Sequence, residues 1–305
     1  MTYKVGVYVT AYKDIKALQK CLDMLQNQSY RIEEIFVVDN SPEQIIFPEH
    51  GLLVKHFPEN IGVAGGLKAG VIWAKEKGYD FLWTFDQDSE PEEFLLEKLL
   101  IKYSLLSYKE FPIGIIAPLP IDINSQSKIH GLIFKEYKFE PVSNIEGTDD
   151  FYECDVLITS GSLIYMNAAK AVELPREDLF LDAVDYFYCM NFRNKGYKIV
   201  IAKEVILSHN LGTTRKLKSA KSKQEVLTYT CSPLRYYYSC RNNTFFETRL
   251  ATKKMLYKTI IYRLNVVKQH FKHIINYEPD LKLLKAWACL LGTAEGFIGR
   301  LGKTW

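Results

Sequence analysis

The chain has 305 residues, of which 48% are apolar and 25% charged, and its formal net charge is only +3. This composition is that of an ordinary globular protein and excludes an intrinsically disordered chain. No run of about 18 uninterrupted apolar residues occurs, so we predict no transmembrane helix. The amino terminus has no basic segment leading into an apolar one, so we predict no signal peptide. The six cysteines lack zinc-type spacing and are expected to be reduced thiols of a cytoplasmic protein.

The small net charge hides an asymmetry along the chain. Residues 1–210 carry 21 Lys and Arg against 31 Asp and Glu, whereas residues 211–305 carry 18 against 5. The acidic part could hold a cation, and the basic part could meet an anionic partner. We therefore expect two regions with different roles.

The first hundred residues alternate between strand and helix patterns. Strands are predicted at 4–12, 33–41, 52–58 and 79–88, and helices at 15–28 and within 60–78. This alternation indicates βαβ units, hence an α/β fold with a mostly parallel sheet flanked by helices. Beyond it we predict a strand at 111–120, a strand with a helix start at 154–172, a helix and two strand segments within 179–212, and helices from about 225 onward.

Polar side chains follow three of these strands at their carboxyl ends: Thr10, Asp39, and the pair Asp86 and Asp88. Ligands of open α/β sheets bind beyond this edge. Two carboxylates one residue apart suit a divalent cation that bridges the oxygens of a diphosphate. On spacing alone, the alternative that they only begin a loop and cap the next helix stays open.

Three further patterns admit both a functional and a structural interpretation. The glycines of NIGVAGGLKAG (60–70) indicate close backbone approach, either around a ligand or in tight helix packing. Asp182 and Asp185 lie three apart in an aromatic segment predicted to be helical, where desolvation would favour a general base. A helix start that merely favours acidic residues is the alternative. His209 ends a predicted strand and is either structural or a nitrogen ligand sharing a metal with Asp86 and Asp88.

Together these segments resemble the inverting family 2 glycosyltransferases of the GT-A fold, and most closely the bacterial rhamnosyltransferase branch. The resemblance rests on VTAY (9–12), VVDNS (37–41), NIGVAGGLKAG (60–70), TFDQDS (84–89), SGSLIY (160–165), residues 179–199 and SHNLG (208–212), and it extends to the carboxyl end. It implies a GT-A domain over residues 1–212 and a basic, mainly helical region over residues 213–305.

The resemblance also implies roles for single residues. Asp185 would be the catalytic base, and Asp182 would orient the acceptor or the base. Mg²⁺ or Mn²⁺ would be held by Asp88, His209 and Asp86. The nucleotide would be contacted by Thr10, Ala11, Tyr12, Asp39, Asn60, Gly62 and Asp86. The sequence departs from the family at Phe187, where a glutamate is common.

The resemblance predicts metal-dependent, inverting transfer of rhamnose from dTDP-rhamnose to a polysaccharide or a lipid-linked oligosaccharide. The alternatives are a UDP-sugar donor (galactofuranose or N-acetylhexosamine) or a non-catalytic scaffold that binds sugar nucleotides. Nucleic acid is not an expected partner, because the basic region carries no recognised binding module. The amphipathic, cationic segment 252–276 would contact the inner face of the cytoplasmic membrane, or else pack on the first domain or a second copy of the chain.

Overall fold

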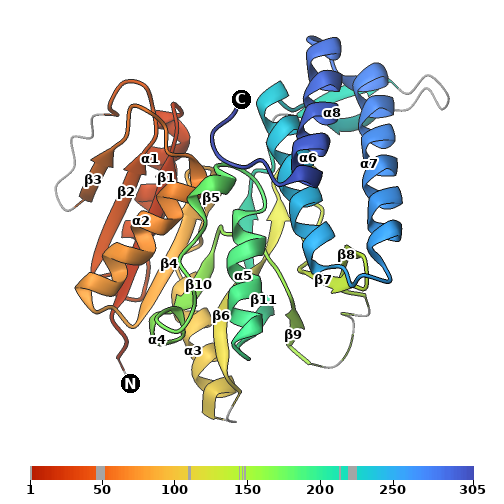
Figure 1. Cartoon of the computed structure of the whole chain (residues 1–305). Coiled ribbons are helices and arrows are strands. Elements are labelled where there is room, and N and C mark those ends of the chain that lie inside the picture. The colour runs from red at the N-terminus through yellow and green to blue at the C-terminus, as the bar shows by residue number, and fades with distance from the viewer. Residues whose placement is uncertain are drawn as a thin grey trace. The chain divides into compact units, whose positions relative to one another are not determined.

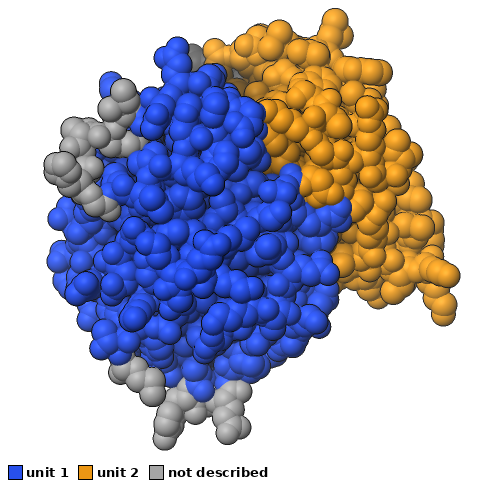
Figure 2. Space-filling model, turned by 60° about the vertical axis from the view of Figure 1, so that its left-hand side comes forward, with its two compact units in different colours: residues 1–133, 141–177, 184–210 blue, residues 134–140, 178–183, 211–305 orange. Residues whose placement is uncertain are grey.

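The computed structural model describes residues 2–45, 52–108, 111–143, 145, 147, 149–212, 214–218 and 225–305. The chain divides into two compact units, coloured blue and orange in Figure 2. Unit 1 comprises residues 1–133, 141–177 and 184–210, and unit 2 comprises residues 134–140, 178–183 and 211–305. Two short segments from the first part of the sequence therefore belong to the unit that is formed mainly by the last 95 residues.

Unit 1 is built on a central sheet that has nine strands within the described residues (Figure 1). Their order in space is β3-β2-β1-β4-β10-β6-β11-β5, and β9 pairs with β11. The strands are β1 (Val5–Ala11), β2 (Glu34–Asp39), β3 (Leu52–His56), β4 (Phe81–Asp86), β5 (Ser89–Glu90), β6 (Ile113–Asp122), β9 (Phe151–Cys154), β10 (Ser162–Tyr165) and β11 (Lys198–His209). The helices are α1 (Ile15–Gln26), α2 (Gly62–Lys77), α3 (Leu95–Tyr108), α4 (Met166–Ala169) and α5 (Val184–Asn194). A 3₁₀ turn (Glu177–Leu179) and a hairpin of β7 (Leu132–Lys135) and β8 (Lys138–Pro141) each include residues of both units.

The predicted α/β fold, a large sheet flanked by helices, is confirmed. Strands β3, β2, β1 and β4 run parallel to one another, as do β6 and β11. Strand β10 enters antiparallel between β4 and β6, and β5 and β9 pair antiparallel with β11. The parallel strands thus bring their carboxyl ends to one edge, and β11 adds its own end beside β5.

Strand β1 shows how helices cover both faces of the sheet. Successive side chains of a strand point to opposite faces. Val7 and Val9 join an apolar cluster with α1 and α3, whereas the intervening Tyr8 packs against α2. A Cβ at Gly66 or Gly70 of α2 would overlap the Tyr8 side chain, so these two glycines serve helix packing.

Three elements differ from their sequence predictions. Strand β11 is one strand rather than two, with a register shift between Ala202 and Ile206. Residues 225–229 form strand β13 and not the start of a helix. Helix α5 begins at Val184, so Asp182 lies before the helix, in left-handed backbone with φ of 61°, and does not share a helix face with Asp185.

Unit 2 consists mainly of three helices, α6 (Pro233–Leu250), α7 (Leu256–Tyr277) and α8 (Lys282–Ile298), with the antiparallel pair β12 (Thr214–Lys218) and β13 (Glu225–Tyr229). Ser232 caps α6, since its side chain accepts a hydrogen bond from the backbone N–H of Arg235. Helices α6 and α8 approach closely, because a Cβ at Gly292 or Gly296 would overlap backbone carbonyls of α6. Across the described residues we find no helix with both the length and the apolar character needed to cross a bilayer.

Candidate active site

The carboxyl edge of the parallel strands gathers several of the residues selected from the sequence. In the register of the sheet, Thr10 of β1 lies beside Asp86 of β4, and Ala11 lies beside Asp39 of β2. Four residues predicted from three separate segments therefore stand at neighbouring strand ends. This is the edge at which α/β sheets bind ligands.

Asp86, Asp88 and His209 form a compact cluster beyond this edge. One ligand atom from each of the three lies within 4.8 Å of the other two. His209 reaches the cluster because β11 pairs antiparallel with β5, which sets His209 directly opposite Ser89. The histidine is buried, and its Nδ1 is 3.7 Å from Asp88 Oδ1. The structure thus brings together the three residues that the sequence suggested as metal ligands.

Two serines that the sequence analysis did not select hold this cluster in place. Ser89 Oγ is hydrogen-bonded to Nδ1 of His209 at 3.0 Å and also to the hydroxyl of Ser160. Ser160 Oγ in turn accepts a hydrogen bond from the backbone N–H of Asp86. A ring nitrogen fixed by such a partner orients the imidazole. The sequence did carry a trace of this arrangement, because Ser89 directly follows the second aspartate and Ser160 begins the SGS segment.

Gln87, between the two aspartates, fixes the loop that follows β1. Its side-chain oxygen accepts a hydrogen bond from the backbone N–H of Tyr12 at 2.8 Å, and its amide nitrogen donates to the Tyr12 carbonyl at 3.0 Å. Tyr12 is therefore tied by its backbone while its side chain stays largely exposed. The sequence analysis selected Tyr12 but gave no role to Gln87.

Asp39 is fully buried, and both of its carboxylate oxygens accept hydrogen bonds from backbone N–H groups. Oδ1 accepts from Ser41 at 2.9 Å, and Oδ2 accepts from Ile45 at 2.8 Å. These bonds hold the segment that leaves β2. Buried charges are tolerated in proteins when they are hydrogen-bonded in this way.

Asn60 and Gly62 form the turn that leads into α2. Both have left-handed backbone, with φ of 53° and 72°. The side-chain oxygen of Asn60 accepts a hydrogen bond from the N–H of Gly62 at 2.9 Å. Asn40, which was not selected from the sequence, fixes the same turn because its side chain accepts from the N–H of Ile61 at 3.0 Å. The turn is thus anchored next to the end of β2.

Asp182 and Asp185 belong to different units. Asp185 is in the first turn of α5, in unit 1, and its Oδ1 accepts a hydrogen bond from the N–H of Tyr186. Asp182 belongs to unit 2; its Oδ1 is 3.8 Å from Nε of Arg235. Its Oδ2 is buried and meets no hydrogen-bond partner among the described residues. Burial raises the pKa of the Asp182 carboxyl above its usual range, against the opposing charge of Arg235.

Phe187 occupies the position where the family commonly has a glutamate. The guanidinium of Arg176 lies over its ring, 5.2 Å from the centroid. A cation above an aromatic face is an attractive arrangement. Phe187 therefore makes a cation–π contact with Arg176 at this position of α5.

Solved structures of glycosyltransferases share the fold. Residues 1–349 of TarS from S. aureus superpose with a TM-score of 0.52 at 14% identity, over 96% of this chain and 80% of that one. GalNAc-T7, solved with UDP, GalNAc and Mn²⁺, gives a TM-score of 0.60 at 13% identity, over 97% of this chain and 56% of that one. The chain thus has the GT-A fold of these glycosyltransferases.

The sequence comparisons point to one family of glycosyltransferases. Residues 6–104 match the model of the glycosyl transferase family 2. The dTDP-rhamnosyl transferase RfbF of Shigella flexneri is 27% identical over 243 residues, which cover 78% of this chain and 77% of that one. The galactofuranosyltransferase GlfT1 of Mycobacterium tuberculosis is 20% identical over 272 residues, covering 84% and 86%. These matches support a family 2 glycosyltransferase, an enzyme that depends on a nucleotide sugar.

Proposed function

We propose that this glycosyltransferase moves rhamnose from dTDP-rhamnose onto a polysaccharide or a lipid-linked oligosaccharide, with inversion and with the help of a divalent metal. The observation that carries the proposal is the cluster of Asp86, Asp88 and His209 at the carboxyl edge of the parallel strands. The choice of rhamnose and dTDP rests on the relative from Shigella flexneri.

The residues of the cluster fit a divalent cation. Carboxylate oxygens are the preferred ligands of Mg²⁺ and Mn²⁺, and an imidazole nitrogen is more acceptable to Mn²⁺ than to Mg²⁺. Asp86, Asp88 and His209 would hold the ion, which would neutralise charge that develops on the departing diphosphate. Ser89 and Ser160 would keep the ligands in position.

Asp185 is the proposed general base. Its carboxylate would take the proton of the acceptor hydroxyl as that oxygen attacks the anomeric carbon, and the bond from this carbon to the diphosphate oxygen would break in the same step. One displacement inverts the anomeric configuration. A positioned base contributes about 10²–10⁴-fold to the rate, and positioning and electrostatics contribute the rest. Asp182 would orient the acceptor or Asp185.

The residues that line the strand ends would bind the nucleotide. Thr10, Ala11 and Tyr12 would contact the nucleobase. Gln87 fixes the loop that contains Tyr12 through two hydrogen bonds to its backbone. Asp39 would meet the base on the same side, since Asp39 lies beside Ala11 in the sheet.

A second donor is favoured by a specific observation. The relatives from Mycobacterium tuberculosis are galactofuranosyltransferases and align over a larger share of the chain, although at lower identity. A UDP-sugar, galactofuranose or an N-acetylhexosamine, is therefore the alternative donor. We further propose that the enzyme works in the cytoplasm at the inner face of the membrane, where a lipid-linked acceptor would be found, and that it could act as a homo-oligomer.

Calorimetric titration separates these possibilities. The full chain and Asp88→Asn would be titrated with dTDP, UDP and GDP in the presence of Mn²⁺, Mg²⁺ or EDTA. Glu76→Gln is the control, because it removes one exposed negative charge on α2. We expect metal-dependent preference for dTDP, lost in Asp88→Asn and kept in Glu76→Gln. A preference for UDP would mean that the donor is a UDP-sugar. If no nucleotide bound under any condition, the proposed transferase activity would be refuted and the non-catalytic scaffold would be favoured.

A further inference from the structure

Helix α8 exposes an apolar row along its whole length. Its inward face carries Lys285, Gly292 and Glu295 among other buried residues. Its outward face carries Leu283, Trp287, Leu290 and Ile298, of which Leu283 is 89% and Ile298 is 76% exposed. Both charged side chains between residues 283 and 299 point inward. A helix that only faced water would be polar on its outer side.

Helix α7 repeats this inversion. The residues that it buries include Thr259 and Arg263, which are polar. Large apolar side chains instead lie exposed on its surface, among them Tyr257, Ile261, Leu264 and Ile275. Two neighbouring helices of unit 2 therefore place polar groups inside and apolar groups outside. Such exposed apolar surface marks an interaction site.

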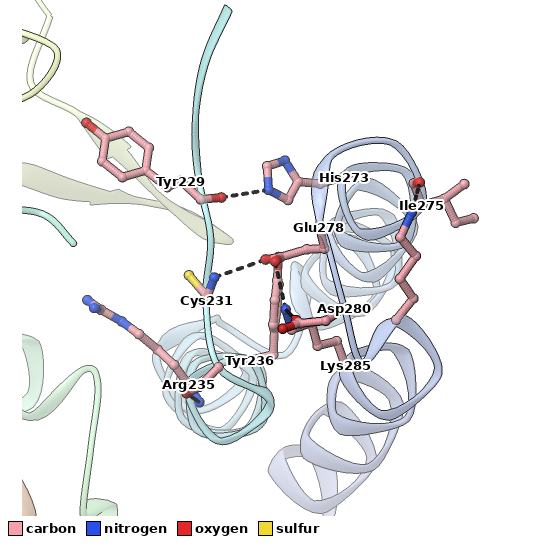
Figure 3. Close-up of polar contacts among 11 residues, drawn as sticks. Tyr229, Cys231, Arg235, Tyr236, His273, Ile275, Glu278, Asp280 and Lys285 are labelled. Carbon is pink, nitrogen blue, oxygen red and sulfur yellow. Dashed lines mark hydrogen bonds and ion pairs between the residues drawn. The ribbon is translucent and has the colours of Figure 1, made fainter. Parts of the chain in front are cut away.

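Three of the four acidic side chains that the structure describes within residues 211–305 are buried. Glu278 is buried at the start of the α7–α8 connection, where it accepts hydrogen bonds from Lys285, Tyr236 and the N–H of Cys231 (Figure 3). Glu247 is buried against Arg263 at 3.3 Å, and Glu295 is buried and paired with Arg300 at 3.0 Å.

The surface that remains is cationic. Among the side chains described in this region, Asp280 is the one exposed acid, and it already pairs with Lys285 at 2.8 Å. The exposed cations are more numerous and include Lys253, Lys254, Lys268, Lys272, Lys282, Arg300 and Lys303. Lys268 and Lys272 are on α7, and Lys282 and Arg300 flank the apolar row of α8. Helices α7 and α8 therefore carry both the exposed apolar side chains and exposed positive charges.

We propose that the outer face of α8, with the exposed apolar side chains of α7, lies on the anionic surface of a phospholipid bilayer. Leucine and tryptophan side chains would enter the boundary between head groups and acyl chains, and the lysines would contact lipid phosphates. A second copy of the chain suits this face less well, because the same positive charges would meet across the interface. This inference rests on the proposed function in one respect: membrane binding would give the enzyme access to a lipid-linked acceptor.

Vesicle binding of the full chain tests the proposal without any nucleotide. Phosphatidylcholine vesicles, with and without phosphatidylglycerol, would be sedimented with the protein. We expect binding that is about tenfold or more tighter to the anionic vesicles. Leu283→Asp combined with Ile298→Asp should weaken it by about tenfold or more, because both side chains are exposed and would otherwise enter the lipid. Leu105→Asp, on an exposed leucine of α3 in unit 1, is the matched control and should bind as the unchanged chain does.

Tryptophan fluorescence gives a second readout. Trp73 and Trp83 are buried and Trp305 is half-buried against the Tyr237 ring, whereas Trp287 on α8 is 55% exposed. Brominated phosphatidylcholine in the anionic vesicles should quench the emission of Trp287, and Trp287→Phe should abolish that quenching.

Three results would overturn the proposal: no preference for anionic vesicles, equal binding by the double variant, or a dimer in sedimentation velocity without lipid that the double variant dissociates. Titration of the double variant with dTDP keeps the two proposals distinguishable. If the double variant still binds dTDP but not vesicles, the proposed transferase function is unaffected. If the unchanged chain binds vesicles but no nucleotide, only the proposed function is refuted.

Discussion

Replacing Asn242 with alanine should disrupt the loop that leads into α5. This loop has left-handed backbone at Phe180, Asp182 and Ala183, with φ between 56° and 61°. Left-handed backbone costs about 1–2 kcal/mol for each residue that is not glycine, so the loop needs external restraint. Asn242 on α6 supplies it, because its amide nitrogen donates to the carbonyls of Leu179, Leu181 and Asp182 at 2.6–2.9 Å.

The magnitude follows from the bonds lost. The amide has two N–H groups, each worth about 1 kcal/mol net, and the carbonyls left buried without a donor add about 1–3 kcal/mol. We expect Asn242→Ala to lower the free energy of unfolding by about 3–5 kcal/mol. Asn243→Ala is the matched control. Asn243 donates one hydrogen bond to a carbonyl of its own helix, so its loss should cost under about 1 kcal/mol.

Urea unfolding followed by circular dichroism measures the difference, and sugar transfer measures its consequence. If the loop relaxes instead of destabilising the protein, Asp182 moves, and transfer should fall while dTDP affinity is kept. A variant Asn242→Ala that matches Asn243→Ala in both stability and transfer would refute the reasoning.

The sequence was sufficient for those parts of the site that depend on local pattern. The apolar runs ending at Thr10, Asp39 and Asp86 identify parallel strands, and parallel strands must end at the same edge. Strand β13 was also within reach, since the segment EVLTY is rich in residues that favour strands. Predicting a helix there extended the helical pattern of α6 across Pro233, where that helix begins.

Other features depend on contacts between distant segments and have no local pattern. Asp182 reads as a helix residue because it lies three positions before Asp185, yet Asn242, sixty residues later, holds its carbonyl in a left-handed loop. The same holds for β11, where the polar residues Lys203 and Glu204 suggest a break. Pairing with β6 continues on both sides of a register shift, so the strand is unbroken.

Three further predictions test packing, burial and the cluster of Asp86, Asp88 and His209. Gly292→Ala should destabilise the protein by about 1–3 kcal/mol, because the new Cβ would overlap a carbonyl of α6. Ala294→Gly, on the exposed side of α8, is the control and should cost about 1 kcal/mol through helix propensity alone. Urea unfolding of the two variants measures the difference. Asp182→Asn should stabilise the protein increasingly as pH rises. The folded pKa of Asp182 is raised, so the wild type loses stability as the pH rises from the ordinary aspartate pKa of about 4 through the raised value, whereas the variant does not. Thermal unfolding from acid to neutral pH measures this. A stability difference between variant and wild type that did not change with pH would show that burial is not the cause. Ser89→Ala should weaken metal-dependent dTDP binding by about tenfold, because the Ser89 hydroxyl is hydrogen-bonded to Nδ1 of His209 at 3.0 Å and orients the ring toward the cluster. Titration in EDTA should show no difference between this variant and the wild type, since the serine acts only through the metal ligand. An equal loss with and without metal would mean that Ser89 shapes the nucleotide pocket itself, and His209 would then have no demonstrated part in holding an ion.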